Sequence, residues 1–586
     1  MSENKLNLTL KSEKFRLYFV IGGITAIGLV LRLYTISKKS LWMDELRQTS
    51  YYYSSSLTHL IERAASQNQP PLDYFIGYLL AFFFDGSELL YRFPAMIFGT
   101  LIIILTFCIT KELFTPKIAI LASFFTALSK VLVEYSQEAR PYSLFIFLLL
   151  LSLWLLLRAL SNGDLRHWLL FGISLYLMLI SRVLLPIVAL YTLNILFLSA
   201  GILNYFMKNK SVFFKGENVA KILLTSLLAF IAYYPFFYII KSASGSLSSR
   251  SISFSSMTTT LKHFSIDIMI EHFIRLTYPL TWLYLFFLLS ALVFALIKVK
   301  KKPLVLFFTL FVLMLPFVQV FVMNELNLRM YLRYSVYYLP FLYILVSAGI
   351  VYTSHIPDKF VKPLWKISSV LIIFFSLFIA LISINSLRNY YFIQDKTDWR
   401  GASQHLMNIL GDKDVILTES FHEYGTWEPG FIGRWFYFNS INEDYNIDGL
   451  TNYLFSNPET KGNLVLLLFM NFQGSKKPPI VSDQLEVREF TGLNIITLKE
   501  PSKLLMENYW VMYSELLRFM PEDSSRVDLY LNAARWPIAS SNVKEAEAYF
   551  SKAKKLVQNH MEKRLDSKLE YYRRYLYKDL DTGIVR

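Results

Sequence analysis

Cysteine and charged residues are scarce in this chain of 586 residues. The single cysteine, Cys108, excludes an intrachain disulfide and a cysteine-based zinc site. Charged residues make up 18% of the sequence, against about 25% in soluble domains, whereas aromatic residues reach 17%. The mean hydropathy is +0.38, and apolar runs of bilayer length recur from Leu17 to Ile384. A soluble core does not need such runs, so the composition indicates a polytopic membrane protein.

Two further features of the sequence bear on other classes of protein. No small-residue cleavage site follows the first apolar segment, so we interpret that segment as a retained helix rather than a signal peptide. The net charge of +15 would suit a nucleic-acid-binding protein, but the lysines cluster in short loops between apolar runs. This is the positive-inside pattern of membrane proteins, and it argues against a nucleic-acid partner.

A helix needs about 20 apolar residues to cross a bilayer. The run 168–205 would be about 57 Å long as one helix, so we expect it to break near Arg182. The short run 72–84 follows two prolines and predicts a helix that lies in the membrane interface. The pattern favours eleven spans, and thirteen would have the same parity. The eleven lie near residues 17–36, 92–110, 117–133, 141–158, 168–181, 183–205, 219–240, 278–297, 303–323, 333–352 and 365–385.

The basic loops set the expected topology. With the N-terminus inside, every short inner loop carries lysine or arginine. The outer side then receives the loops 37–91, 134–140, 241–277 and 324–332, and everything after residue 386. We therefore expect an integral protein of the bacterial inner membrane, with its active site and C-terminal domain on the periplasmic side.

The chain changes character near residue 390, which predicts three domains. Residues 1–390 are expected to form the membrane domain, residues 391–500 a small extramembrane α/β domain, and residues 501–586 a helical tail. The tail is either a tetratricopeptide-like hairpin or a plain helical hairpin, which we favour, and a protein partner for it is open. The α/β domain is predicted to contain a helix over Trp399–Leu410 and strands over Asp414–Leu417, Leu464–Phe469, Leu485–Phe490 and Asn494–Leu498.

Four outer pieces are rich in groups that act on charged ligands. They are Asp44-Glu45 with Arg47; Asn68-Gln69-Pro70-Pro71-Leu72 with Tyr91-Arg92-Phe93-Pro94; Tyr135-Ser136-Gln137-Glu138-Ala139-Arg140-Pro141-Tyr142; and Arg329, Arg333 and Tyr334. In this order they resemble the C-type glycosyltransferase superfamily, and within it the protein O-mannosyltransferases and the lipid A aminoarabinose transferases. The octapeptide 135–142 is the most specific element. Asp398-Trp399-Arg400 is similar to the family's start of its C-terminal domain.

The resemblance implies a membrane enzyme that moves a sugar from a polyprenyl-phosphate donor to an acceptor hydroxyl, with inversion. The acceptor, a glycan, a lipid or a protein, stays open, as does the sugar. The resemblance makes Asp44, Glu45 and Glu138 catalytic candidates. Gln69 stands where relatives carry a histidine or lysine thought to meet the donor phosphate, and Arg182 lies near where relatives often have a His-Tyr pair.

The chemistry of the donor supports these roles independently. Phosphate is already a good leaving group, so the second carboxylic acid of a glycosidase is not required. The reaction needs one base for the acceptor hydroxyl and positive charge on the phosphate. Asp44 suits the base, and Arg140 and Arg333 suit the phosphate because guanidinium binds its oxygens bidentately. Glu138 could orient the arginines or share a divalent cation with Asp44, and we commit to no metal.

Other interpretations were weighed beside these. Arg92 is favoured as an anchor for lipid headgroups, with a site role as the alternative; Arg47, Tyr135 and Tyr142 are further site candidates. His263 and His272 are interpreted as surface residues rather than metal ligands. A transporter or flippase is the main rival function, but its usual mid-span charges and internal repeats are not found. A non-catalytic scaffold is the third possibility.

Overall fold

The computed structural model describes residues 3–66, 69–83, 87–206, 211–244, 266–299, 301–325, 330–357, 367–392, 398–409, 415–419, 464–468, 485–490, 493–498, 548–549, 551–552 and 555. The chain divides into two compact units. One is Met1–Lys38 with Tyr51–Ile393, which we call the helical unit. The other is Lys39–Ser50 with Gln394–Arg586, which we call the C-terminal unit. Each is described by itself.

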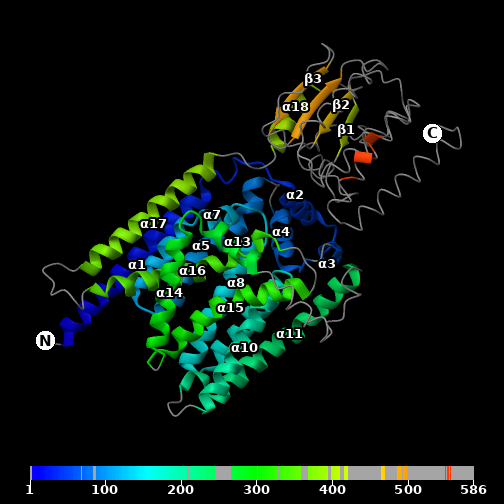
Figure 1. Cartoon of the computed structure of the whole chain (residues 1–586). Helices are drawn as coiled ribbons and strands as arrows, with labels where there is room; N and C mark the ends of the chain where they lie inside the picture. The colour runs from blue at the N-terminus through cyan, green and yellow to red at the C-terminus, as the bar shows by residue number, and fades with distance from the viewer. Residues whose placement is uncertain are drawn as a thin grey trace. The chain divides into compact units, whose positions relative to one another are not determined.

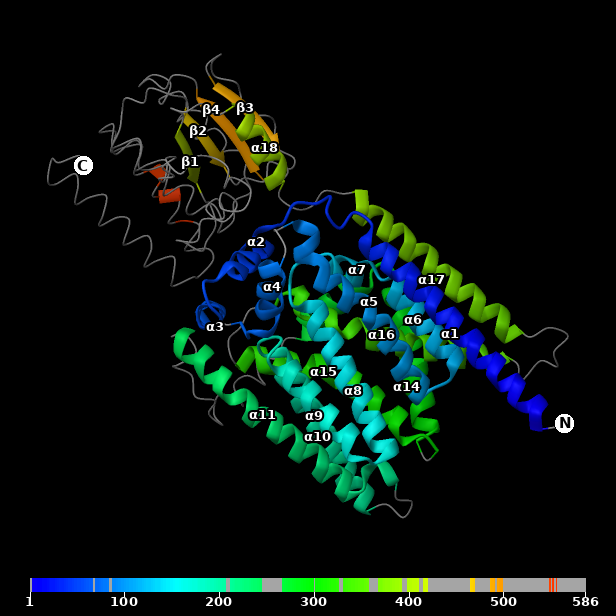
Figure 2. The same cartoon turned by 180° about the vertical axis from the view of Figure 1, so that it is seen from behind.

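The described part of the helical unit consists of helices, seen from two opposite sides in Figure 1 and Figure 2. They are α1 (Glu3–Leu33), η1 (Tyr51–Tyr53), α3 (Leu57–Ser66), α4 (Leu72–Phe83), α5 (Glu88–Leu113), α6 (Pro116–Leu128), α7 (Lys130–Ser136), α8 (Tyr142–Asn162), α9 (Leu165–Leu179), α10 (Leu185–Phe206), η2 (Val212–Phe214), α11 (Gly216–Ser244), α13 (Ile266–Thr277), α14 (Thr281–Ile297), α15 (Pro303–Glu325), η3 (Leu332–Tyr334), η4 (Val336–Tyr338), α16 (Leu339–Ser354) and α17 (Ile367–Phe392).

These helices make the protein a polytopic membrane protein. Among the described residues, eight helices are long and apolar enough to cross a membrane. The bent pairs α6 with α7 and α13 with α14 raise the number to ten if each pair is one span. The predicted span 168–181 corresponds to α9, whose 15 residues rise only about 22 Å. Each of the eleven predicted spans thus has a helical counterpart, and the interfacial run 72–84 corresponds to α4.

The predicted outer loop 241–277 is wrong at both ends. Helix α11 continues to Ser244, and α13 begins at Ile266 and runs to Thr277. The apolar residues of α13 are spaced at helical periodicity, so this segment buries one face instead of forming an open loop. Most of the serine-rich part of the predicted loop lies outside the described residues.

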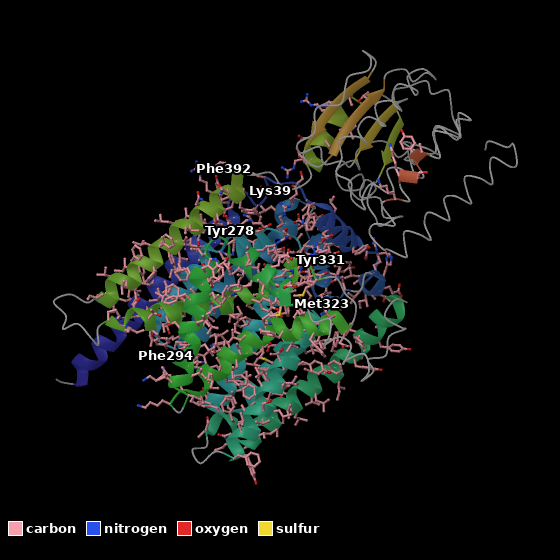
Figure 3. The ribbon with its side chains drawn as sticks, viewed as in Figure 1. Lys39, Tyr278, Phe294, Met323, Tyr331 and Phe392 are labelled. Carbon is pink, nitrogen blue, oxygen red and sulfur yellow. The ribbon has the colours of Figure 1, made fainter. Side chains whose placement is uncertain are left out.

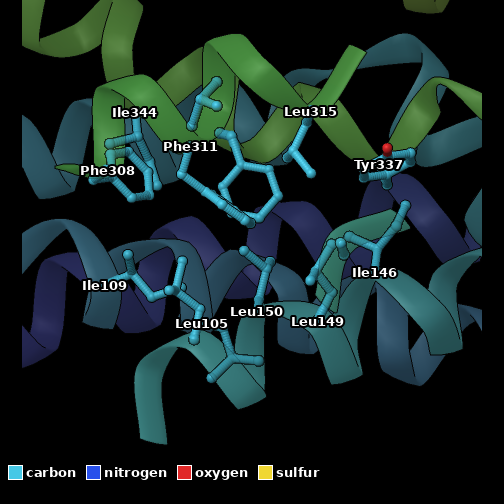
Figure 4. Close-up of a cluster of buried hydrophobic side chains, with 14 of the residues drawn as sticks. Leu105, Ile109, Ile146, Leu149, Leu150, Phe308, Phe311, Leu315, Tyr337 and Ile344 are labelled. Atoms are coloured by element: carbon cyan, nitrogen blue, oxygen red, sulfur yellow. The ribbon is translucent and has the colours of Figure 1, made fainter. Parts of the chain in front are cut away.

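The helical unit is built around α8 and α16. In the most apolar part of the stretch Leu332–Ser354, which consists of η3, η4 and α16, 83% of the residues are buried. In that of α8 78% are, whereas in that of α17 only 17% are. Helices α8 and α16 are therefore central, and α17 exposes most of its surface to whatever surrounds the bundle. Figure 4 shows the core between them, where leucine and isoleucine side chains of α5 and α8 face Phe308 and Phe311 of α15 and Ile344 of α16.

Helices α14 and α16 approach each other closely at Gly349. A Cβ atom built on Gly349 would lie 2.1 Å from the backbone oxygen of Phe287 in α14. Real Cβ atoms do not approach a carbonyl oxygen so closely, so only glycine allows this backbone contact. The Phe287 ring is itself fully buried beside it.

The described C-terminal unit contains helix α2 (Met43–Ser50), helix α18 (Trp399–Ile409) and a four-stranded sheet. The strands are β1 (Val415–Glu419), β2 (Leu464–Leu468), β3 (Leu485–Phe490) and β4 (Leu493–Leu498), in the order β1-β2-β4-β3. Strands β1 and β2 are parallel, and the other two pairings are antiparallel. The helix and the four strands match the sequence prediction to within a few residues. Most of the tail 501–586 lies outside the described residues.

Asp398 begins α18 and also holds the segment that leads to α2. Its carboxylate accepts the Gly401 backbone N–H at 3.0 Å, which caps the N-terminus of the helix. The same oxygen accepts the Ser40 hydroxyl at 3.2 Å, and the Ser40 oxygen accepts the Arg400 backbone N–H at 3.2 Å. The Asp-Trp-Arg sequence therefore fixes the chain a few residues before Asp44.

Candidate active site

Two residues of the octapeptide 135–142, Gln137 and Ser136, have structural roles. The Gln137 side-chain amide donates to the carbonyl oxygen of Arg32, in the last turn of α1, at 2.9 Å and to that of Tyr34, just beyond the end of α1, at 2.6 Å. Its oxygen accepts the Tyr390 hydroxyl of α17 at 2.9 Å. Carbonyl groups at a helix C-terminus lack partners within the helix, so Gln137 caps α1 and ties it to α17. Figure 1 shows these two helices side by side.

Ser136 is the second residue of the octapeptide with a structural role. Its hydroxyl oxygen accepts the Arg32 side chain at 3.2 Å, and the fully buried Arg32 also donates to the carbonyl oxygen of Gly28 at 2.9 Å. A Cβ atom on Gly99 of α5 would lie 2.0 Å from the Ser136 hydroxyl oxygen. The glycine therefore makes room for the Arg32–Ser136 contact between α1, α5 and α7.

Two other residues of the octapeptide, Tyr135 and Tyr142, belong to a cluster of aromatic rings and guanidinium groups. We call Tyr135, Tyr142, Arg182, Arg333 and Tyr334 the tyrosine–arginine cluster. The Tyr135 and Tyr142 rings meet edge to face with their centres 4.8 Å apart. The Arg182 guanidinium carbon lies 4.1 Å from the centre of the Tyr142 ring and 5.6 Å from that of Tyr334. The Arg333 guanidinium carbon lies 5.8 Å from the Tyr334 ring centre.

This cluster brings together residues that are far apart in the sequence. Tyr135 is in α7, Tyr142 begins α8, and Arg333 and Tyr334 are in η3. Tyr135 also lies within the electrostatic reach of Glu138. Rings that lie over guanidinium groups attract them through their electron-rich faces, which favours the charged form in a poorly solvated place. The sequence prediction named four members of the cluster, Tyr135, Tyr142, Arg333 and Tyr334, as site candidates, and it did not name Arg182 among them.

Arg182 is held in the turn between α9 and α10, where the sequence predicted a break. The Ser181 hydroxyl donates to the Met178 carbonyl at 2.7 Å, and the Leu185 N–H donates to the Val183 carbonyl at 2.8 Å. Leu184 between them has a φ of 66°, which is uncommon for a residue with a side chain. The Leu72 N–H at the start of α4 donates to the Ile180 carbonyl at 3.1 Å. The turn is thus fixed on both sides. The missed signal was an arginine between two apolar runs.

Gln319 of α15 fixes the segment that carries Arg333 and Tyr334. Its fully buried amide donates to the Tyr334 carbonyl at 3.2 Å. Its oxygen accepts the Tyr337 hydroxyl at 3.1 Å and the Tyr338 hydroxyl. All three bonds satisfy polar groups inside the bundle, where an unpaired group is costly. Gln319 is therefore a positioning residue for η3 and η4.

The interpretation of His272 as a surface residue is wrong. Its side chain is only 7% exposed, and its Nδ1 lies 2.8 Å from the Ser335 hydroxyl. The reason is the helix α13, which forms where the sequence predicted a loop and which turns His272 into the bundle. His272 thereby fixes Ser335, the residue after the Tyr334 that Gln319 holds. His263 lies outside the described residues.

A large apolar cavity of about 730 Å³ adjoins this segment. Its walls come from α13, α14, α15 and α16, and from the segment between α15 and α16. Met330, Ser335 and Tyr338 of that segment line it, so they flank Arg333 and Tyr334 on both sides along the chain. Figure 3 labels the lining residue Tyr278, well apart from Phe294 at the other end of α14. The cavity therefore offers an apolar ligand a place along the segment that carries Arg333.

The acidic pair lies in the C-terminal unit, at the start of α2. Asp44 and Glu45 are both in the first turn, where the helix dipole favours negative charge. The Glu45 carboxylate is fully buried and accepts the Trp42 backbone N–H at 3.2 Å, as the third residue of a capping box does. Asp44 is half-buried. Glu45 therefore has a structural role as a helix cap, in addition to its predicted one. The side chain of Arg47 is outside the description.

The favoured interpretation of Arg92 as a headgroup anchor is wrong. Its side chain is 1% exposed, and Nη1 donates to the Ile36 carbonyl at 2.6 Å. The chain turns just after α1, with Thr35 at a φ of 64°, and Arg92 satisfies a carbonyl left without a helical partner there. An arginine so deeply buried cannot reach lipid headgroups.

The remaining predicted residues are placed as follows. Gln69 is half-buried just before α4, and Glu138 and Arg140 lie in the turn between α7 and α8, with Glu138 buried. Asn68 and Arg329 lie outside the described residues. Among the described residues, no group of three or more His, Cys, Asp and Glu side chains is placed to hold a metal ion. A divalent cation shared by Asp44 and Glu138 thus stays a prediction.

A comparison with protein families tests the resemblance. Residues 68–239 match the family described as dolichyl-phosphate-mannose-protein mannosyltransferase. The predicted likeness to the C-type glycosyltransferases is confirmed. The match contains Gln69, the octapeptide and Arg182, and it ends before the segment with Arg333. A comparison with curated proteins finds no match.

Solved structures of two membrane transferases are also similar to the chain. ArnT from Cupriavidus metallidurans, solved in the apo state and bound to undecaprenyl phosphate, is 10% identical over 81% of this chain and 97% of that one, with a TM-score of 0.49. The archaeal oligosaccharyltransferase AglB from Archaeoglobus fulgidus, in complex with an inhibitory peptide and a dolichol-phosphate, is 13% identical over 78% of this chain and 69% of that one, with a TM-score of 0.41.

Proposed function

We propose that this protein transfers a sugar from a polyprenyl-phosphate donor to an acceptor hydroxyl, with inversion at the anomeric carbon. The observation that carries the proposal is the position of Arg333 in a segment that also lines the 730 Å³ apolar cavity. A lipid phosphate needs both features at once, because its chain requires apolar walls and its headgroup requires cations.

Each candidate residue has a distinct role in this reaction. Arg333 binds the donor phosphate and stabilises the charge that grows on it as the sugar leaves. The cavity holds the part of the polyprenyl chain nearest to the phosphate. Asp44 takes the proton of the acceptor hydroxyl. Gln319 and His272 act through η3 and η4, since they hold the Tyr334 carbonyl and the Ser335 hydroxyl, in the two residues that follow Arg333.

Arg333 provides the direct test of the donor. Arg333→Lys keeps the charge but loses the bidentate fork, so polyprenyl phosphate binding and turnover should fall together, and Arg333→Ala should be worse. We expect the alanine variant to lose about 10- to 100-fold in affinity, the range for a hydrogen bond to a charged group. Donor affinity is measured on purified protein, beside its melting temperature in detergent.

The matched control is Arg158, which pairs with Glu112 at 3.0 Å near the other end of α8. Arg158→Ala removes the same side chain about 24 Å from Tyr142 along that helix, so it should leave donor affinity unchanged. Arg333→Ala with wild-type donor affinity and a lowered melting temperature would instead identify Arg333 as a structural anchor.

The outward orientation of the site is part of the proposal and is tested by cysteine labelling. In a Cys108→Ser background, Asn408→Cys in α18 should react with a membrane-impermeant reagent in spheroplasts. Ser161→Cys, in a loop predicted to be inside, should react only after permeabilisation. Both residues are exposed, so neither result depends on burial. Protection of position 408 in intact spheroplasts would overturn the topology.

A further inference from the structure

Arg182 is a buried cation with a donor that no described residue satisfies. Its side chain is 5% exposed, and its Nη1 is buried with no hydrogen-bond partner in the part of the chain that the structure describes. Its Nη2 donates to the Tyr142 hydroxyl at 3.2 Å, and no described carboxylate pairs with it. A guanidinium removed from water loses hydration that two aromatic rings replace only in part, so this position suits an anionic ligand.

Arg182 and Arg333 face the same ring, and this arrangement indicates the chemical class of the ligand. Both guanidinium groups lie within 6 Å of the centre of the Tyr334 ring. Two positive charges that face the same ring repel each other, and the repulsion is stronger in a bundle interior than in water. An anion with several oxygens would relieve this repulsion and accept a hydrogen bond from Nη1. A phosphate has that form, and its oxygens accept from two guanidinium groups at once.

The apolar cavity indicates that the phosphate is attached to a lipid chain. Met330 and Ser335, which line it, flank Arg333 and Tyr334 in the chain, and Tyr334 is the ring that Arg182 also faces. An anion held by both arginines would therefore lie next to the segment that lines the apolar cavity. A phosphate attached to a lipid chain fits there, whereas a free inorganic phosphate would leave the cavity unused.

We propose that Arg182 binds the phosphate of the donor lipid and holds it together with Arg333. The inference rests on the proposed function, because it adds a residue to the donor site. The turn 180–184, closed by backbone and side-chain bonds on both sides of Arg182, keeps the guanidinium in place before the lipid arrives. Such preorganisation lowers the cost of binding.

The experiment compares undecaprenyl phosphate with undecaprenol, the same chain without the phosphate, on the purified full-length protein. Wild type should bind the phosphate form more tightly. Arg182→Gln should reduce this preference by about 10- to 100-fold while undecaprenol binding stays as in wild type. Arg158→Gln, at the far end of α8, should keep the full preference. An unchanged preference in Arg182→Gln would overturn the inference.

A structural role for Arg182 predicts a different pattern. If the stacking on Tyr142 alone mattered, Arg182→Gln would lower the melting temperature and weaken both lipids equally, which would also overturn the inference. Should that variant not fold, Arg182→Lys decides, because lysine keeps the charge without the planar fork. We expect the lysine variant to lose several-fold in preference; a wild-type preference would contradict the proposal.

The double variant tests whether one phosphate is shared. If both arginines hold the same group, Arg182→Gln with Arg333→Ala should cost less than the two single losses added. Strictly additive losses would contradict the shared phosphate. The proposed function fails in a recognisable way: wild type would then show no preference for undecaprenyl phosphate over undecaprenol, and the inference would fall with it. A wild-type preference that survives in Arg182→Gln removes only the role of Arg182.

Discussion

Replacing Asp44 with asparagine should lower sugar transfer by about 100-fold or more and leave the affinity for polyprenyl phosphate unchanged. Asparagine has the same shape and can still accept a hydrogen bond, but it cannot take a proton from the acceptor hydroxyl. The assay is transfer from a polyprenyl-phosphate sugar to an acceptor identified by mass spectrometry of surface glycans and glycolipids, with donor binding measured on the same protein.

Glu45→Gln is the matched control for this prediction. Its neighbour Asp44 is half-buried at the helix start, whereas Glu45 is fully buried and caps the Trp42 N–H. Glutamine serves as well as glutamate in this cap, so the fold of α2 should persist and the loss of turnover should be small. Equal turnover of wild type and Asp44→Asn would remove Asp44 as the base. A larger loss in Glu45→Gln than in Asp44→Asn would transfer the role to Glu45.

The second large effect is expected on stability. Gly349→Ala places a methyl group 2.1 Å from the Phe287 backbone oxygen, so helices α14 and α16 must move apart. The cost of such overpacking is about 1–3 kcal/mol, and the upper end is expected because backbone cannot turn aside as a side chain can. The melting temperature in detergent should fall. Donor binding should fall too, since Leu339 and Leu342 of α16 line the apolar cavity.

Gly22 and Gly23 of α1 provide the control for Gly349. A Cβ atom on either would have no atom of another described segment within 4 Å. Alanine there should be neutral or slightly stabilising, because it is the better helix former. A Gly349→Ala variant as stable as Gly22→Ala would show that α14 and α16 tolerate separation, contrary to the close packing described above.

Arg92 and His272 show where pattern-based interpretation failed, and the cause is the same for both. Each is a polar residue near the end of an apolar run, where an exposed position is the ordinary expectation. Each instead satisfies a group that only the folded chain creates: the Ile36 carbonyl for Arg92 and the Ser335 hydroxyl for His272. Periodicity reports which faces are apolar, but it does not report which partner a buried polar group will meet.

The octapeptide shows the same limit within one motif. Its sequence was specific enough to indicate the superfamily, but the sequence did not separate its two roles. Ser136 and Gln137 hold the end of α1, while Tyr135 and Tyr142 join the arginines. Both halves are needed for one geometry, since the turn that presents the rings is fixed by the bonds that cap α1.

The sequence by itself determined the membrane class, the eleven helical segments, the helix and strands after residue 398, and the residue types of the site. These depend on local composition and spacing, which dictate where a chain can cross a bilayer or pair as a strand. Only the tertiary structure decided that Lys39–Ser50 groups with the C-terminal residues, that Arg182 meets Tyr142 and Tyr334, and that a cavity lies beside Arg333. Such contacts join segments up to 360 residues apart, and no local pattern specifies their partners.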